Sequence, residues 1–182
     1  MMRLPTPRQP APELSVETLE HGRFALSDRT PGTFTMLVFY RGLHCPVCRG
    51  YLQELAQHLA AFGERGVDVL AVSGDDADRA GRTQDEWDVA GLPIGFGLSE
   101  EAMDDWGLYV SAAIKDGEPA RFNEPGLFLV DANGAIFYVA VNSMPFGRPK
   151  LADMLDAVDF VTSQDYPARG EVAAGGPAVA AG

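Results

Sequence analysis

Cys45 and Cys48 are the residues whose type and spacing most directly suggest chemistry, and the chain contains no other cysteine. They stand in the segment His44-Cys45-Pro46-Val47-Cys48, between an apolar run and an amphipathic stretch. If a helix begins here, a spacing of three residues places both sulfurs on one face, one turn apart. At that separation the two thiols can close a disulfide, so the spacing predicts two-electron thiol–disulfide chemistry.

The expected position of the pair at a helix N-terminus also predicts an activated thiol. Unpaired N–H groups and a positive partial charge at such a terminus stabilise a thiolate, which is the reactive form. Pro46 suits the first helical turn, where its missing N–H is not needed. We expect Arg41, His44 and Arg49 to add positive potential around the sulfurs.

Two structural interpretations of the same residues stand beside the redox one. The cysteines could be buried and inert, or they could bind zinc, which needs about four ligands. The nitrogen donors available for zinc are His21, His44 and His58, and His58 lies far along the expected helix. His44 can also be read as a solvated turn residue. We therefore expect no metal and no other cofactor.

The elements that must position the pair alternate along the chain. The apolar run over 33–40 predicts a buried strand before the cysteines, and apolar residues at helical spacing predict a helix over 46–65. The Asn133-Gly134 dipeptide favours a tight turn between two strands. The other expected elements are a hairpin around His21-Gly22, strands over 67–73 and 94–98, a helical stretch over 77–90 with Trp87 packed inward, a short helix over 100–106, a loop over 111–124, strands over 126–130 and 135–141, and a helix over 151–161.

This order predicts an α/β fold with a mixed central sheet flanked by helices. Strands that alternate with helices indicate parallel pairing, whereas the later hairpin adds antiparallel strands. We expect one domain over 13–166, preceded by an extended Pro-rich lead over 1–12 and followed by a flexible tail over 167–182.

Composition and charge exclude several classes of function. The 182 residues carry 26 acids against 14 bases, a net charge of -12. Such a surface repels phosphate, which argues against nucleic acid and anionic membranes as partners. The N-terminus lacks the apolar core of a signal peptide, and no apolar run reaches the ~20 residues of a membrane span. These features favour a cytoplasmic protein.

The segment over 39–49 resembles the active-site segment of peroxiredoxins of the alkyl hydroperoxide reductase/thiol-specific antioxidant group. It is most similar to the branch with an Arg-Gly-x-x-Cys-Pro-x-Cys-Arg signature, and further similar stretches lie over 72–75, 105–108, 126–131 and 142–148. The resemblance spans about residues 12–171. It implies a thioredoxin-like fold with an N-terminal β-hairpin extension, and an antioxidant enzyme that reduces hydroperoxides through a Cys45–Cys48 dithiol/disulfide cycle.

The chain departs from the family pattern at positions that bear on this activity. Cys48 matches the family's peroxide-attacking cysteine, while Cys45 replaces its threonine and Arg41 its proline. Pro125 stands where the family has a second essential arginine, and Ala173 where the two-cysteine subgroup has its resolving cysteine. These departures leave open which of the two cysteines is the nucleophile.

Two other functions therefore stand beside the peroxidase. One is a thioredoxin-like disulfide reductase, in which Pro125 acts as the cis-proline facing the pair and Cys45 attacks. The other is a non-enzymatic redox sensor or binding module. A peroxidase would need another cation, and Arg121 could swing in to supply it. Both enzymatic interpretations need an external thiol reductant such as thioredoxin, glutaredoxin or glutathione, and the resemblance favours a possible homodimer.

Overall fold

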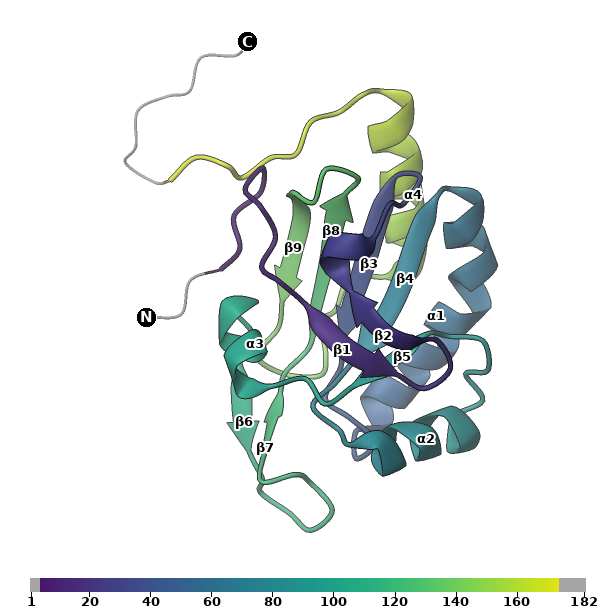
Figure 1. The fold of residues 1–182 in the computed structure, drawn as a ribbon, viewed down its shortest axis with the longest axis vertical. Helices are drawn as coiled ribbons and strands as arrows, with labels where there is room; N and C mark the ends of the chain where they lie inside the picture. The colour runs from purple at the N-terminus through teal and green to yellow at the C-terminus, as the bar shows by residue number, and fades with distance from the viewer. Residues whose placement is uncertain (1–3, 174–182) are drawn as a thin grey trace.

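A computed structural model describes residues 4–173 and shows a mixed sheet with helices on both sides (Figure 1). The seven-stranded sheet has the order β2-β1-β5-β4-β3-β8-β9. The elements in chain order are β1 (Ser15–Thr18), β2 (Gly22–Ala25), a 3-10 turn (Leu26–Asp28), β3 (Phe34–Phe39), α1 (Pro46–Glu64), β4 (Val67–Val72), α2 (Ala77–Glu86), β5 (Ile94–Phe96), α3 (Glu100–Asp105), β6 (Val110–Ala112), β7 (Arg121–Asn123), β8 (Gly126–Asp131), β9 (Ile136–Val141) and α4 (Leu151–Ser163).

Strand β3 lies inside the sheet, between β4 and β8, and leads into the cysteine segment. All six of its side chains are buried, as a strand covered on both faces requires. It pairs in parallel with β4 and antiparallel with β8, each over six residue pairs. The expected α/β fold with a mixed sheet is therefore confirmed, and so is the N-terminal hairpin, because β1 pairs antiparallel with β2.

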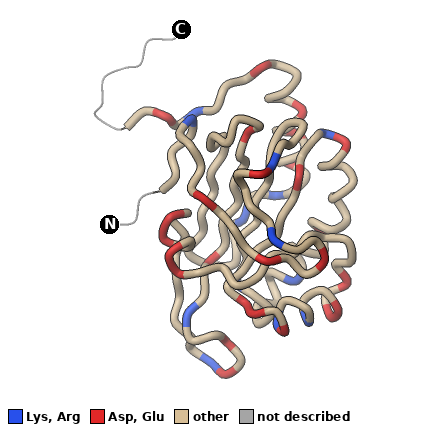
Figure 2. Tube along the Cα trace, viewed as in Figure 1, with Lys and Arg blue, Asp and Glu red and all other residues tan. Residues whose placement is uncertain are grey.

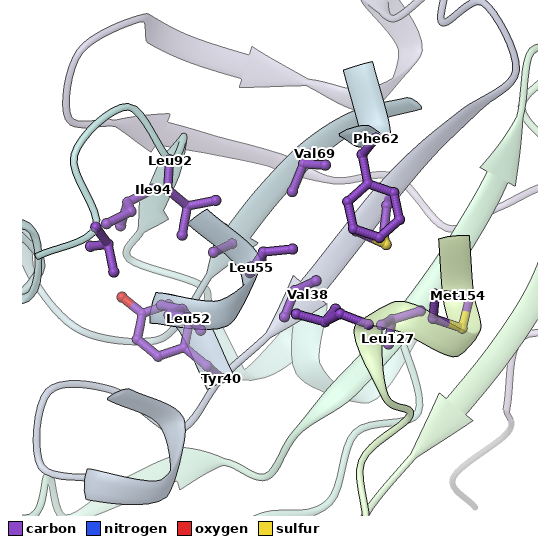
Figure 3. Close-up of a cluster of buried hydrophobic side chains, with 14 of the residues drawn as sticks. Val38, Tyr40, Leu52, Leu55, Phe62, Val69, Leu92, Ile94, Leu127 and Met154 are labelled. Carbon is purple, nitrogen blue, oxygen red and sulfur yellow. The ribbon is translucent and has the colours of Figure 1, made fainter. Parts of the chain in front are cut away.

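Two hydrophobic clusters cover the two faces of the sheet. The larger cluster joins alternate residues of β3 and β4 to the buried sides of α1, α2 and α4, and Figure 3 shows Leu52, Leu55 and Phe62 of α1 within it. The second cluster joins the opposite face to α3 and the N-terminal strands, with Trp106 fully buried. Helix α1 is thus fixed along its length, and its first turn is held at the end of β3.

The segment over 111–124, expected as a loop, contains a separate two-stranded sheet. Strands β6 and β7 pair antiparallel, from Val110 opposite Asn123 to Ala112 opposite Arg121. Neither strand has a long apolar run, so the sequence pattern gives little sign of them; their residues are held by pairing with each other. This hairpin projects from the end of the molecule where α2 also lies (Figure 1).

The remaining expected elements are present with small differences at their ends. Helix α2 ends at Glu86, because Trp87 turns into the core at 3% exposure and Asp88 adopts a positive φ of 54°. No helix within 4–173 combines the length and apolarity needed to cross a bilayer.

The two ends of the described chain lie against each other. Arg8 donates from its backbone N–H to Ile136 and from Nε to the carbonyl of Ala168, at 2.8 and 3.0 Å. Ala168 is buried. The proposed domain limits stay predictions, and the part of the expected tail over 174–182 lies outside the described residues.

Candidate active site

Cys45 occupies the N-cap of α1, and Pro46 begins the helix. The Cys45 backbone is extended, and its Sγ accepts a hydrogen bond from the backbone N–H of Cys48 at 3.3 Å. The sulfur therefore takes the place that a serine or aspartate oxygen holds at an ordinary N-cap. A thiolate in this position is stabilised by the N–H groups of the helix terminus.

A buried carboxylate, that of Asp75, fixes the backbone of the turn before Cys45. Asp75 follows β4, its side chain has no exposed area, and its Oδ2 accepts the backbone N–H of Leu43 at 2.7 Å. Its other oxygen accepts from Arg79 Nε, also at 2.7 Å. Gly42 passes so close that an added Cβ would lie 2.7 Å from this carboxylate, and its φ is +117°, so only glycine fits there.

Hydrogen bonds lower the pKa of Cys45 below its ordinary value. The largest contribution comes from the thiol of Cys48, and the backbone N–H of Cys48 and the charge and hydrogen bond of Arg41 act in the same direction. Burial opposes them, because a charged sulfur is poorly solvated there. The balance favours a thiolate on Cys45.

Cys48 lies inside the first turn of α1 and behaves in the opposite way. Burial raises its pKa most, and the hydrogen bond that it donates to Cys45 raises it further. The guanidinium of Arg148 opposes this shift: its Nη2 lies 3.5 Å from the Cys48 Sγ. The pair therefore consists of a thiolate on Cys45 and a protonated thiol on Cys48.

Arg148 is held over the pair by a loop and an aromatic ring. Its guanidinium lies 4.3 Å from the centre of the Tyr51 ring, and its Nε donates to the carbonyl of Pro145 at 3.1 Å. The Asn142 amide braces the same loop by donating to Phe146 and Gly147. The sequence pattern marks 142–148 as a family-like stretch but gives no sign of a role for Arg148.

Arg41 is held on the other side of the pair by a buried acid that the sequence analysis did not select. Its Nε lies 3.3 Å from Oε2 of Glu124, whose side chain is only 4% exposed. Glu124 also accepts the Ser111 hydroxyl at 2.6 Å, and the Arg41 guanidinium lies 4.7 Å from the centre of the Phe122 ring. Ser111 lies in β6, Phe122 lies in β7, and Glu124 follows β7 directly. The β6–β7 hairpin, which has no strong sequence pattern, therefore positions all three residues.

His44 lies beside this cluster but does not add positive charge to it. Its ring packs against Phe122 with centroids 4.5 Å apart. Burial and the neighbouring charge of Arg41 lower the pKa of His44 to about 4, so the ring is neutral near pH 7. The expectation that His44 contributes positive potential was therefore wrong, because a half-buried imidazole next to a guanidinium does not hold a proton.

The other candidates are placed unevenly around the pair. Arg49 is exposed on α1, one residue after Cys48. Arg121 is exposed and pairs with Glu100 at 2.8 Å, so the structure does not bring it to the sulfurs. Pro125 is buried, and all peptide bonds over 4–173 are trans, so the expected cis-proline is not there. The Pro125 carbonyl instead accepts the backbone N–H of Asn142 at 2.9 Å and so fixes the start of the loop that carries Arg148.

Within the described ranges, no group of three or more His, Cys, Asp and Glu side chains is arranged to hold a metal ion. Both cysteines are free thiols and almost fully buried, at 1% and 0% exposure.

The fold and the site together define a thioredoxin-fold protein with a dithiol at a helix N-terminus. Residues 7–139 match the model of the AhpC/TSA family, well over half of the chain. The chain belongs to the AhpC/TSA family.

Individual relatives agree with this membership. The chain is 26% identical over 149 residues to peroxiredoxin-2 of Cricetulus griseus, which covers 77% of this chain and 71% of the relative. It is 38% identical over 65 residues to the 1-Cys peroxiredoxin PER1 of Arabidopsis thaliana, which covers 36% of this chain and only 30% of the plant protein.

Solved structures of peroxiredoxins share the fold. A mutant of peroxiredoxin 6 from Arenicola marina superimposes with a TM-score of 0.73 at 15% identity, covering 88% of this chain and 75% of the other. Mycobacterium tuberculosis AhpC gives 0.72 at 17% identity, covering 91% and 98%. At this level of identity the similarity concerns the fold.

Proposed function

We propose that the protein is a thiol-dependent peroxidase that reduces hydroperoxides through Cys45 and Cys48. The observation that carries the proposal is the division of roles within one helical turn. Cys45 is an N-capping sulfur that accepts the backbone N–H of Cys48 and whose pKa is lowered, and Cys48 is a thiol whose pKa is raised. Membership of the AhpC/TSA family and the peroxiredoxin relatives support the same function.

The reaction follows from this division. The Cys45 thiolate attacks the terminal oxygen of a hydroperoxide, so that an S–O bond forms and the O–O bond breaks. The released alkoxide or hydroxide takes a proton, and Cys45 becomes a sulfenic acid. Cys48 then attacks the oxidised sulfur, water leaves with the Cys48 proton, and the Cys45–Cys48 disulfide closes. Two equivalents of an external thiol restore both thiols.

Arg41 and Arg148 are the groups that stabilise charge in these steps. Arg41 acts at the first sulfur, and Glu124 fixes its direction. Arg148 lies 3.5 Å from the second sulfur, where it favours the thiolate that attacks the sulfenic acid. This arrangement offers donors at both sulfurs without the arginine that Pro125 replaces.

Trapping of the sulfenic acid in single-cysteine variants tests the proposal. Treat Cys48→Ser and Cys45→Ser with one equivalent of hydrogen peroxide in the presence of dimedone, and measure intact mass. We expect an adduct in Cys48→Ser and little in Cys45→Ser, while the unmodified chain loses two hydrogens and gains no adduct. An adduct formed mainly through Cys48 would reverse the assignment, and no reaction at either cysteine would contradict a peroxidase.

The partners and the compartment belong to the same proposal. The substrate is a hydrogen or organic hydroperoxide, and the reductant is an external thiol such as thioredoxin, glutaredoxin or glutathione. We propose a cytoplasmic protein, in keeping with free thiols and the negative charge of the chain. A homodimer is proposed from the family membership.

A further inference from the structure

A pocket of about 530 Å³ lies beside the N-terminus of α1 and is lined by more bases than acids. This volume is within the range of small-molecule sites, roughly 300–1,000 Å³. Its charged wall consists of Arg49, Arg79, Arg82, Lys115, Glu86 and Asp116. Helices α1 and α2 and the connection between β6 and β7 supply these residues, so three separate segments converge on the pocket.

Four cations at one pocket are unusual in a chain with a net charge of -12. Along the backbone trace, acidic residues lie over most of the elements and basic ones are scattered between them (Figure 2). Within 4–173, Arg49 and Lys115 have no carboxylate within 4.0 Å, whereas Arg79 pairs with Asp75 and Arg82 with Glu86. Arg79 also keeps its buried Nη2 without a hydrogen-bond partner. The pocket thus retains cationic donors that the protein does not neutralise.

The pocket is placed for access to Cys45. His44 and Pro46, the residues on either side of Cys45, both line it. The Cys45 sulfur is buried and is not part of the lining, so attack on it by a molecule bound in the pocket requires that the turn carrying His44 moves aside. Arg148, which faces Cys48, lies outside this lining, so the pocket belongs to the Cys45 side of the pair.

We propose that this pocket binds a small thiol that carries two carboxylates and an ammonium group, of the glutathione class, as the reductant of the Cys45–Cys48 disulfide. The inference rests on the proposed function, whose reductant it narrows to one class. The unpaired Arg49 and Lys115 match the carboxylates, and Asp116 matches the ammonium. A neutral thiol of the same size lacks these contacts.

The reduction balances through one mixed disulfide. The thiolate of the bound molecule attacks the Cys45 sulfur, so a new S–S bond forms and the Cys45–Cys48 bond breaks. Cys48 leaves with the electron pair and takes a proton from the solvent, so it ends as the protonated thiol of the reduced pair. A second thiolate attacks the small-molecule sulfur, releases Cys45 as a thiolate, and leaves as the oxidised small-molecule disulfide.

The first experiment measures binding without turnover. S-methylglutathione keeps the three charged groups but has no free thiol, and its diethyl ester lacks both carboxylates. In calorimetric titrations of the reduced protein we expect S-methylglutathione to bind and the diester not to bind. Added salt should weaken the binding, because ion pairs at an open pocket are screened. Equal binding of both, or binding of neither, overturns the inference.

The second experiment compares turnover with glutathione and with its diethyl ester. We expect kcat/KM for hydrogen peroxide reduction to favour glutathione, and Lys115→Gln to reduce that preference by about tenfold, the effect of losing one charge-assisted contact. Arg49→Gln should act in the same direction. Arg169→Gln removes an exposed cation in the C-terminal segment and should keep the preference. A preference that no pocket variant changes overturns the inference.

The two proposals fail in different ways. Peroxide consumption supported by dithiothreitol, with no preference for glutathione over its ester, leaves the peroxidase standing and overturns the pocket assignment. Absence of peroxide consumption with every thiol contradicts the peroxidase, and the binding titration still decides the pocket.

Discussion

The two sulfurs of this site lie one helical turn apart and are both hidden from solvent, yet their surroundings shift their pKa values in opposite directions. Cys45 caps the helix, accepts the N–H of Cys48 and lies on the side of Arg41 and Glu124. Cys48 lies within the helix, donates to Cys45 and meets a single cation, Arg148. Burial raises the pKa of both thiols. The two differ in which cause is larger: the hydrogen bonds that Cys45 accepts outweigh its burial, whereas burial is the largest cause for Cys48 and outweighs the charge of Arg148.

This comparison explains how a chain without the family's usual threonine and second arginine can still separate a nucleophile from a resolving thiol. The sulfur at the position of the threonine receives the stabilisation of the helix terminus, and the sulfur one turn later keeps its proton. The variants below each remove one of the two sulfurs or the cation beside it.

Loss of one cysteine should have the largest effect. Cys45→Ser should lower peroxide consumption by about a thousandfold or more, because the thiolate nucleophile is gone. Cys48→Ser should still complete the first oxidation and then stop or turn over slowly, because the sulfenic acid has no neighbouring thiol. Stopped-flow measurement of the first turnover separates the two variants. Equal loss of the first turnover in both would mean that the sulfurs act as one unit.

Removal of the cation on the Cys45 side should have the next largest effect. In Arg41→Gln the pKa of Cys45 should rise by roughly one unit, since a nearby positive charge lowers a thiol pKa by about one to three units. With the pKa of Cys45 at about 6, a rise of one unit leaves about half of Cys45 as thiolate at pH 7, which slows the first oxidation by about twofold. Loss of the charge that Arg41 stabilises in that step should bring the total to about tenfold, and only the twofold part should recover as the pH is raised. Ultraviolet thiolate absorbance against pH in the Cys48→Ser background measures the shift.

A control for this variant must deal with Glu124, which would otherwise remain buried without its partner. The double variant Arg41→Gln with Glu124→Gln keeps the site free of that charge and should show the same rise in pKa. Arg121→Gln removes an exposed guanidinium and should leave the titration unchanged. If Arg121→Gln shifts it as much as Arg41→Gln does, the effect is one of net charge alone.

Removal of the cation on the Cys48 side should affect the second step instead. Arg148→Met should raise the pKa of Cys48 further, and should slow disulfide closure by several-fold to about tenfold, because less Cys48 thiolate is available to attack. The rate of sulfenic acid formation at Cys45 should change much less. Rapid-mixing mass spectrometry follows both species. A variant that slows only the first oxidation would place Arg148 on the nucleophile's side and contradict the comparison.

The sequence was sufficient to place the two sulfurs but not to tell them apart. Strand 33–40, the helix from Pro46 and the spacing of the cysteines are local patterns, and each agrees with the structure within one or two residues. The hydrogen bond from the Cys48 thiol to Cys45 and the buried Asp75 below the turn depend on side-chain directions and on a partner 30 or so residues away. Periodicity carries no information on either.

The same reason accounts for the arginines. Arg121 stands four residues before Pro125 and was therefore expected near the pair, but the β6–β7 hairpin turns it towards Glu100. Arg148 is a hundred residues from Cys48 and reaches it because β9 returns along β8 and the following loop folds back over α1. A short hairpin with no apolar run and a loop fixed by Asn142 are features that single-sequence patterns do not reveal.

Titration of His44 should give the smallest effect, and it acts on stability rather than on chemistry. The folded pKa of about 4 lies below the ordinary value of 6.5, so protonation favours the unfolded chain. The contribution of neutral His44 to stability is therefore fully present above about pH 6.5 and is lost as the pH falls towards 4.

The variant His44→Gln cannot take up this proton. We expect its melting temperature to fall less than that of the unmodified protein between pH 7 and pH 4, although carboxylates destabilise both at low pH. Calorimetric melting temperatures across this range measure the difference. Parallel curves would mean that His44 keeps an ordinary pKa, and the imidazole would then carry a positive charge on the Cys45 side of the pair below pH 6.5.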